Sequence, residues 1–323
     1  MLSRVAENLY WMSRYLERAE STARLIGAHG SAALDLPKHV RPDWASIISI
    51  TGNDQLFHDR YVDASEAHVI RFILADENNP GSVLSSIRFA RENARTIRDI
   101  IPREAWEQIN ELFLNAKSKL ADAISLKHRY QYLDQVILAV CQINGVLAGG
   151  MSHDASYDFV RLGCNLERAD MTSRIVDVRS LGMPAERDEN LKPFENILLM
   201  SVLKSLTAYQ MYRRHLQSAV TRDGALQFLL QDPRFPRSFR FCLGEVRSCL
   251  MSLPRNEVPL LQLRRLETEI SALCTSSLGP EELPVAIDRL QIHLDDVHAA
   301  VVKTYFQCPE TVTVKAEAAS HQD

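Results

Sequence analysis

The stretch that decides the fold is NLYWMSRYLERAESTARLI, residues 8–26. Its apolar side chains recur at alternating steps of three and four, the pattern of one helix face: Leu9, Met12, Leu16, Ala19, Ala23 and Ile26. A second row beside this face is charged and contains Glu17, Glu20 and Arg24. Charged side chains are rarely buried unless they are paired. The stretch therefore predicts a buried helix whose charged row needs partners.

The same pattern returns further along the chain. LERAESTARL at 16–25 matches LERADMTSRI at 166–175, an offset of 150 residues. The matched charged residues are Glu17 with Glu167, Arg18 with Arg168, Glu20 with Asp170, and Arg24 with Arg174. A second match, at an offset of 156, joins FILADENNPGSV at 72–83 to FLLQDPRFPRSF at 228–239. The two matches predict a duplicated helical unit with pseudo-twofold related halves, about 1–150 and 151–308.

Helical periodicity extends over nearly the whole chain, which has 323 residues and is 46% hydrophobic and 24% charged. We predict an all-α fold, an internally duplicated multi-helix bundle that forms a single domain over 1–308. The expected helices are 4–29, 42–51, 64–75, 81–101, 103–122, 129–150, 155–180, 192–218, 222–230, 236–252, 256–275 and 281–306. Residues 309–323, which include the β-like ETVTVKAE, are expected to form a flexible tail.

Charge and hydropathy narrow the function classes. A net charge of −4 supplies no basic field, so we expect no nucleic-acid partner. Without a run of about eighteen apolar residues, no membrane partner is expected. The N-terminal segment lacks the apolar core of a signal peptide. The six cysteines are scattered, as in a reducing compartment. These features together predict a cytoplasmic protein.

The repeated Glu-Arg rows have three possible interpretations. As catalytic residues, Arg18 and Arg168 would bind a carboxylate or phosphate while Glu17 or Glu167 transfers a proton. The anion-binding set would then include Glu20, Arg24, Asp170 and Arg174 from the same rows. As structural residues, the same side chains would form buried ion pairs that fix how the halves pack. A solvated face is the third reading.

A second charged feature lies in SSIRFARENARTIRDII, residues 85–101. Its arginines form one row along the helix: Arg88, Arg91, Arg95 and Arg98. Such a row repels itself unless something anionic faces it. We expect Arg91 and Arg95, with Asn93, to face the interior or a cleft beside Glu17 or Glu20; a solvated basic face is the alternative. In the second half, PRSF at 236–239 contributes Arg237 and Ser238 as candidate anion ligands.

Familiar cofactor signatures are missing from the sequence. No glycine-rich phosphate loop is found, so direct nucleotide binding is not expected. No histidine follows a glutamate by three residues, which argues against a ferritin-like metal pair. We therefore predict no metal and no directly bound cofactor; ATP and Mg²⁺ would reach the chain through a partner protein.

Five segments together resemble the alpha-E family, bacterial all-helical proteins named for a Glu-Arg motif. They are AENLYWMSRYLERAESTARL, ARENARTIRD, AYQMYRRH, PRSF and FVRLGCNLERADMTSRIVDV, and the resemblance runs over about residues 1–308. The motif falls on Glu17-Arg18 and Glu167-Arg168, and ARENAR on residues 90–95. The second half departs from the first at Cys164, which stands where the first half has Arg14.

The resemblance implies partners as well as a fold. Genes of this family commonly neighbour those of a circularly permuted ATP-grasp protein and a transglutaminase-like peptidase. This implies a role as partner or half-enzyme of an amidoligase in peptide synthesis or peptide modification. The alternative is a non-catalytic helical scaffold or binding module, in which the Glu-Arg motifs are structural ion pairs.

Overall fold

The computed structural model describes residues 2–37, 41–181, 192–216, 219–279 and 281–307, and every regular element in these ranges is helical. The helices are α1 (Ser3–Asp35), α2 (Ala45–Thr51), α3 (Asp54–His58), α4 (Glu66–Leu74), α5 (Val83–Thr96), α6 (Arg103–Ile124), α7 (Leu126–Gly150), α8 (Ala155–Leu181), α9 (Lys192–Ser205), α10 (Tyr209–Leu216), α11 (Arg222–Gln231), α12 (Phe239–Ser252), α13 (Glu257–Ala272) and α14 (Glu282–Val301). A 3-10 turn (Thr275–Ser277) precedes α14, and a π-helical turn (Val302–Phe306) follows it.

The all-helical prediction is confirmed, but several elements differ; α5, for example, ends at Thr96 and not at residue 101. The helix expected over 192–218 is divided into α9 and α10 at Thr207, which has a φ of 53°. The short α3 was not predicted from the sequence. α1 continues to Asp35, beyond the expected end at residue 29. The tail expected over 309–323 lies outside the described residues.

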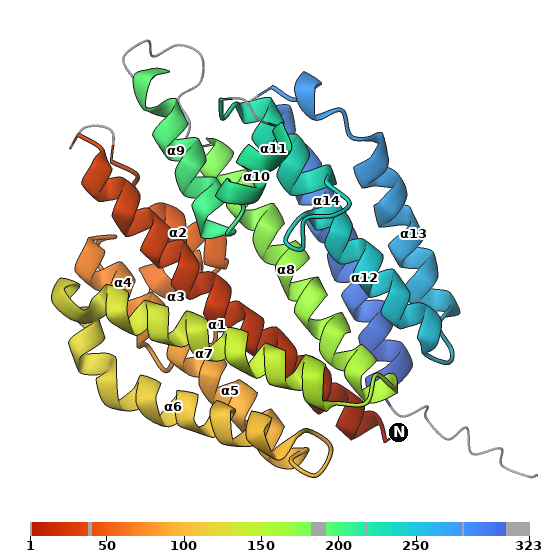
Figure 1. Ribbon diagram of the computed structural model, residues 1–323. Helices are drawn as coiled ribbons and strands as arrows, with labels where there is room; N and C mark the ends of the chain where they lie inside the picture. Colours follow the sequence, from red (N-terminus) through yellow and green to blue (C-terminus); the bar gives the residue numbers. More distant parts are fainter. Residues whose placement is uncertain (1, 38–40, 182–191, 217–218, 280, 308–323) are drawn as a thin grey trace, which may run out of the picture.

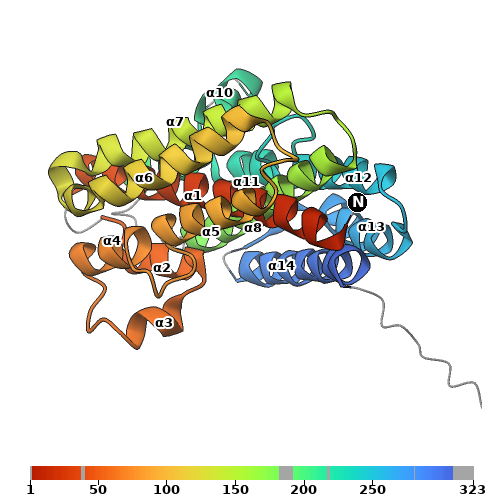
Figure 2. The ribbon, with the colours of Figure 1, turned by 90° about the horizontal axis from the view of Figure 1, so that it is seen from below.

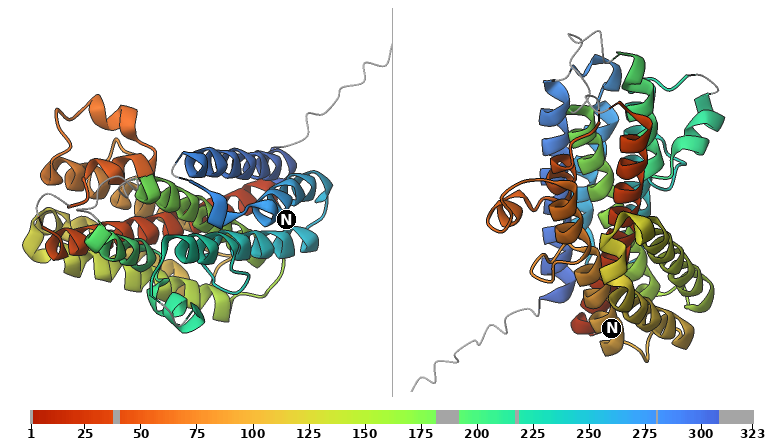
Figure 3. Two further views of the ribbon diagram at one scale, coloured as in Figure 1. Left: turned by 90° about the horizontal axis from the view of Figure 1, so that it is seen from above. Right: turned by 90° about the vertical axis from the view of Figure 1, so that its left-hand side faces the viewer.

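The long helices α1 and α8 lie side by side at the centre of the molecule (Figure 1). α5 packs against α1, and α12 and α14 pack against α8. Seen from below, α6 and α7 cover one side of this central layer, while α2–α4 and α14 lie on the other (Figure 2). The views in Figure 3 show the same three layers. α1 is therefore covered on more than its apolar face.

This central position explains the charged row of α1. The apolar side chains Leu9, Leu16 and Leu25 are buried in one continuous core. Glu17 and Glu20 are only 1% exposed, because α1 packs against α8 as well as α5. A helix enclosed in this way buries its polar row, and its charges must find partners within the protein.

One helix among the described residues, α7, is long and apolar enough to cross a membrane by length and composition alone. Only 28% of its most apolar 18-residue stretch is buried inside the protein. A single such helix is weak evidence, because helices of soluble proteins pass the same test.

Gly163 sets the closest approach of the two central helices. A Cβ at this position would collide with the backbone carbonyl oxygen of Tyr10 in α1. A glycine in mid-helix normally lowers stability relative to alanine. Here it permits the contact that brings the two charged rows together.

We predict that Gly163→Ala lowers the free energy of unfolding by about 1–3 kcal/mol, because the new methyl group forces the helices apart. Gly145→Ala is the matched control, since it lies on an exposed face of α7 with no atom within 4 Å of the new Cβ. It should stabilise the protein by about 0.5–1 kcal/mol. Urea unfolding measures both, and equal effects would contradict a close crossing at Gly163.

Candidate functional site

The two Glu-Arg motifs exchange partners across the α1–α8 interface. Arg18 of α1 donates to Glu167 of α8 through Nε and through Nη2, the latter at 2.9 Å from Oε2. In the reverse direction, Arg168 Nε of α8 lies 3.0 Å from Glu17 Oε2 of α1. Each glutamate is thus paired with the arginine of the other motif.

Each glutamate also has a second arginine. Arg237, in the loop before α12, donates from Nη1 to Glu17 Oε1 at 2.6 Å and from Nη2 to Glu20 Oε1 at 2.8 Å. Arg14 donates from Nε to Glu167 Oε2 at 2.8 Å. Arg14 and Arg237 are both buried. Two guanidinium groups therefore neutralise each buried carboxylate, which is what burial of a charge requires.

The arginines decide the protonation state of both glutamates. Burial would raise the pKa of Glu17, but the charges of Arg168 and Arg237 outweigh it and lower the pKa to about 2. Burial acts in the same way on Glu167, where Arg18 and Arg14 lower the pKa to about 2. A general acid or base works best with a pKa near the operating pH. The geometry favours Glu17 and Glu167 as fixed anions that position arginines.

Two cysteines complete the neighbourhood of the acidic row. Cys164 Sγ lies 3.2 Å from Glu17 Oε2, and Cys141 Sγ lies 3.8 Å from Glu20 Oε1. Burial and the nearby Glu17 keep the pKa of the Cys164 thiol well above its usual value, so it is a neutral donor. The charge missing at Cys164 is supplied instead by Arg237, a residue from a distant loop.

The outer members of both rows are paired within their own helices. Arg24 donates to Glu20, and Arg174 donates to Asp170, each at 2.8 Å and with i, i+4 spacing. The guanidinium of Arg174 also lies against Gly52, where a Cβ would be only 2.7 Å from Nη1. The side chain of Arg174 keeps 31% of its surface exposed.

The arginine row of α5 does not meet the acidic row, so that prediction is wrong. Arg91 donates to Asn110 of α6 and to Glu92, and Arg95 donates to Glu92, with 62% of the Arg95 side chain exposed. Arg91 also lies over the rings of Trp106 and Phe113 in α6. The row is neutralised by nearby carboxylates: Glu92 pairs with Arg91 and Arg95, Glu77 with Arg88, and Asp99 with Arg98.

Asn93 and Ser238 are the two remaining candidate ligands. Asn93 is half-buried on α5. Ser238 is the N-cap of α12: its hydroxyl accepts a hydrogen bond from Phe241 N and donates one to the carbonyl of Asp232. Ser238 thus contributes to the site by fixing the loop that carries Arg237.

Sequence reasoning missed the aromatic contacts of Arg14. Its Nη1 donates to Tyr10 Oη at 3.3 Å, and Tyr10 Oη is 2.7 Å from Nδ1 of His298 in α14. Burial, followed by the charge of Arg14, lowers the pKa of His298 to about 4. The ring is therefore neutral at physiological pH. Only the packing of α14 against α8 brings His298 to this position, so the sequence carries no direct signal for it.

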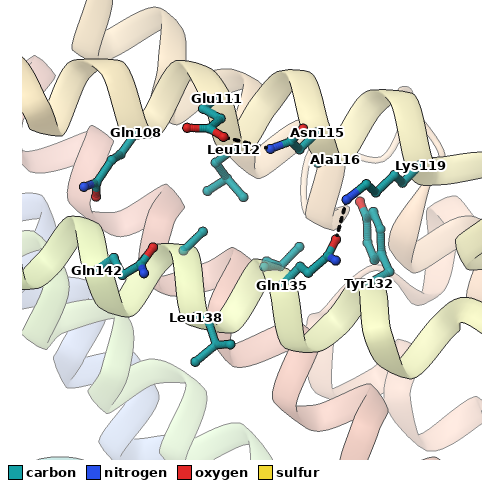
Figure 4. A pocket seen from close by; sticks show the side chains of 12 residues that line it. Gln108, Glu111, Leu112, Asn115, Ala116, Lys119, Tyr132, Gln135, Leu138 and Gln142 are labelled. Atoms are coloured by element: carbon teal, nitrogen blue, oxygen red, sulfur yellow. Dashed lines mark hydrogen bonds between the residues drawn. The ribbon is translucent and has the colours of Figure 1, made fainter.

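Of the two cavities described next, one is lined by residues of the Glu-Arg network and the other is not. A cavity of about 220 Å³ opens beside Glu167, and Arg18, Asp170 and Arg174 line it. A larger one, of about 350 Å³, lies between α6 and α7 (Figure 4). Its charged lining residues are Glu111 and Lys119, and none of its lining residues belongs to the Glu-Arg network. The smaller cavity is therefore the opening associated with the candidate site.

A metal centre finds no support in the part of the chain that the structure describes. In those ranges, no group of three or more histidine, cysteine, aspartate and glutamate side chains is placed to hold a metal ion. The acidic side chains at the α1–α8 interface are instead held by arginines.

Residues 1–306 match the Alpha-E family, described as a predicted alpha-helical domain with a conserved ER motif, and the chain belongs to that family. It is also 24% identical over 321 residues to the uncharacterized proteins Mb2597 of Mycobacterium bovis and MT2643 and Rv2567 of Mycobacterium tuberculosis. Each comparison covers 92% of this chain but only 35% of the relative. The chain thus spans about a third of the length of these relatives. No solved structure matches it.

The lowered pKa values predict a specific pH dependence of stability. Because the pKa of Glu167 is about 2 in the fold and 4.5 in the reference state, its contribution is complete above pH 4.5 and is lost as the pH falls toward 2. Glu167→Gln should lower the free energy of unfolding at neutral pH by about 3–5 kcal/mol. It should also flatten the decline between pH 4.5 and 2.

Urea unfolding across this pH range measures the effect. Glu107→Gln is the control, since Glu107 forms an exposed pair with Arg103 and should keep the wild-type pH profile. A Glu167→Gln variant with wild-type stability and slope would show that Glu167 is not held as a buried anion.

Proposed function

We propose that the chain is the helical partner, or one half, of an ATP-grasp amidoligase that synthesises or modifies peptides. In this proposal Arg18 and Arg174 bind a carboxylate or acyl phosphate in the cavity beside Glu167. The observation that carries it is the cavity of about 220 Å³, which both arginines line with 26% and 31% of their side-chain surface exposed. Arginine is well suited to bind both kinds of anion.

In this account the glutamates orient the arginines, and the partner supplies ATP and Mg²⁺. Glu167 receives two hydrogen bonds from Arg18, so the guanidinium is fixed before any ligand arrives. Prearranged donors lose less entropy when they bind. ATP is assigned to the ligase in this proposal because the sequence predicts no glycine-rich phosphate loop in this chain.

The lengths of the relatives support a role beside another protein unit. The matched region is 35% of each mycobacterial relative, so in those proteins it is joined to a much longer stretch of chain. A helical unit that works with a separate ligase would likewise have to lie close to that ligase. We extend the proposal to a cytoplasmic location, to the transglutaminase-like peptidase as a second partner, and to independence from membranes and nucleic acids.

We also propose that the halves arose by duplication and are related by a pseudo-twofold axis. The exchanged pairs, Glu17 with Arg168 and Glu167 with Arg18, are what such an axis would produce. The matched residues Ser82 and Ser238 are also both N-caps, each accepting a hydrogen bond at 3.1 Å from the residue three positions later.

A scaffold role is the second candidate, and one observation favours it. Glu17 and Glu167 are each held by two arginines, so much of the motif is engaged in holding α1 against α8. Under this alternative the arginines would stabilise the fold without touching a substrate.

The comparison of Arg18→Ala with Arg168→Ala distinguishes the two candidates. Each variant removes one arginine from one buried glutamate, and each glutamate keeps a second one, Arg14 or Arg237. Only Arg18 lines the open cavity beside Glu167. We expect both variants to fold, while Arg18→Ala reduces amide formation at least tenfold more than Arg168→Ala.

The assay mixes the chain with its ATP-grasp partner, ATP, Mg²⁺ and amino-acid or peptide substrates, and detects the product by mass spectrometry. Thermal unfolding of each variant is recorded in parallel. Activity that follows the folded fraction in both variants would favour the scaffold. Full product yield without the chain would eliminate the half-enzyme.

A further inference from the structure

The cavity beside Glu167 has a filled counterpart in the other half of the molecule. In the aligned segments, PGS at 80–82 corresponds to PRS at 236–238, so Gly81 stands where the second half has Arg237. Arg237 extends its guanidinium to Glu17 and Glu20, and the matching residues Glu167 and Asp170 line the cavity next to Gly81. One half fills this space with an arginine, and the other leaves it open.

The matched threonines of the two motifs, Thr22 and Thr172, differ in the same way. Thr172 Oγ1 donates to the backbone carbonyl of Arg237 at 2.9 Å. Its counterpart Thr22 is 1% exposed and lines the open cavity, yet its hydroxyl has no hydrogen-bond partner within the described ranges. Buried hydroxyls without a partner are uncommon, because the lost hydrogen bond costs free energy. The matched threonine is therefore satisfied in the half that Arg237 fills and unsatisfied in the half that is open.

One part of the cavity can accept hydrogen bonds from a cation. Asp170 Oδ1 holds Arg174 Nε, while Oδ2 receives no hydrogen bond from the described residues. Aspartate is also one methylene shorter than Glu20 at the matching position, which leaves more room. In the other half the equivalent pair, Glu17 and Glu20, binds the guanidinium of Arg237. In the other half, a positively charged group therefore occupies the place that corresponds to this part of the cavity.

Arginine donors next to this carboxylate can bind an anion. Nη1 of Arg18 and both Nη atoms of Arg174 make no hydrogen bond to the rest of the described chain. Gly52, with a φ of 69°, has no side chain to displace the Arg174 guanidinium, which rests against it. Two guanidinium groups with spare donors thus share the cavity with two carboxylates.

A ligand with a single charge would be attracted by the groups of one sign and repelled by those of the other. A zwitterion complements both, because its ammonium can meet Asp170 while its carboxylate meets Arg18 and Arg174. The volume of about 220 Å³ lies below that of pockets for drug-sized ligands and suits a smaller molecule. We propose that this cavity binds a free α-amino acid and that Arg237 closes the equivalent site in the second half. The inference rests on the proposed function and names its substrate class.

Binding to the purified chain alone tests this inference. Each of the twenty standard L-amino acids is added singly in a thermal-shift assay, and those that raise the melting temperature are titrated by calorimetry. The N-acetyl and the amide derivatives of a binder each lack one of its two charges. We expect at least one amino acid to bind, and at least a tenfold loss of affinity with each derivative.

Variants of the cavity provide the second arm. Gly81→Arg should abolish binding, because the new side chain occupies the cavity as Arg237 does in the other half. Gly145→Arg is the matched control: it adds the same charge on an exposed helix face and should bind as the wild type does. Asp170→Asn, which keeps the shape of the side chain, should weaken binding of the amino acid at least tenfold.

Several results would overturn the inference. An amide that binds as well as its amino acid would indicate a cation site, and an N-acetyl derivative that binds equally would indicate an anion site. If none of the twenty amino acids binds, or Gly81→Arg binds normally, the assignment is wrong. Because this assay needs no ligase, amino-acid binding without amide formation would refute the proposed function while leaving the site intact.

Discussion

The structure depends on two buried carboxylates, Glu17 and Glu167, at the crossing of α1 and α8. Each is less than 2% exposed, and each is neutralised by two arginines, one of which comes from the opposite motif. Neither helix can be withdrawn without leaving charges buried and unpaired, at a cost of several kcal/mol. Gly163 allows the close approach that such short ion pairs need. The first role of the Glu-Arg motif is therefore to hold the two central helices together.

The network is asymmetric in ways that bear on function. Arg14 completes the environment of Glu167, whereas Cys164 stands at its matched position and Arg237 completes that of Glu17. The guanidinium of Arg237 fills the space beside Glu17, whereas Gly81, at the matched position, leaves the equivalent space beside Glu167 open. Two sites with matching charged rows can thus differ in whether a ligand reaches them. Within one network, some residues of the motif then have a structural role and others are available to bind a ligand.

The sequence predicted the helices and the charged rows because both follow from local periodicity. It could not predict which arginine meets which glutamate, because the exchange between Glu17 and Arg168 depends on how α1 and α8 cross. The arginine row of α5 was misjudged, because Glu92 pairs with both Arg91 and Arg95, and Arg91 also lies over aromatic rings of α6. The loop glycines that shape the cavity, Gly52 and Gly81, carry no signal until the fold places them beside Arg174 and Glu167.

A double-mutant cycle on Arg18 and Glu167 tests the central claim most directly. The free energies of unfolding of Arg18→Ala, Glu167→Ala and the double variant are compared with that of the wild type by urea denaturation. If the pair couples the two motifs, the double variant should lose less stability than the two single losses together, by about 1–3 kcal/mol. Strictly additive losses would show that the two residues do not interact, and would contradict the account of the Glu-Arg motif as an exchanged ion pair.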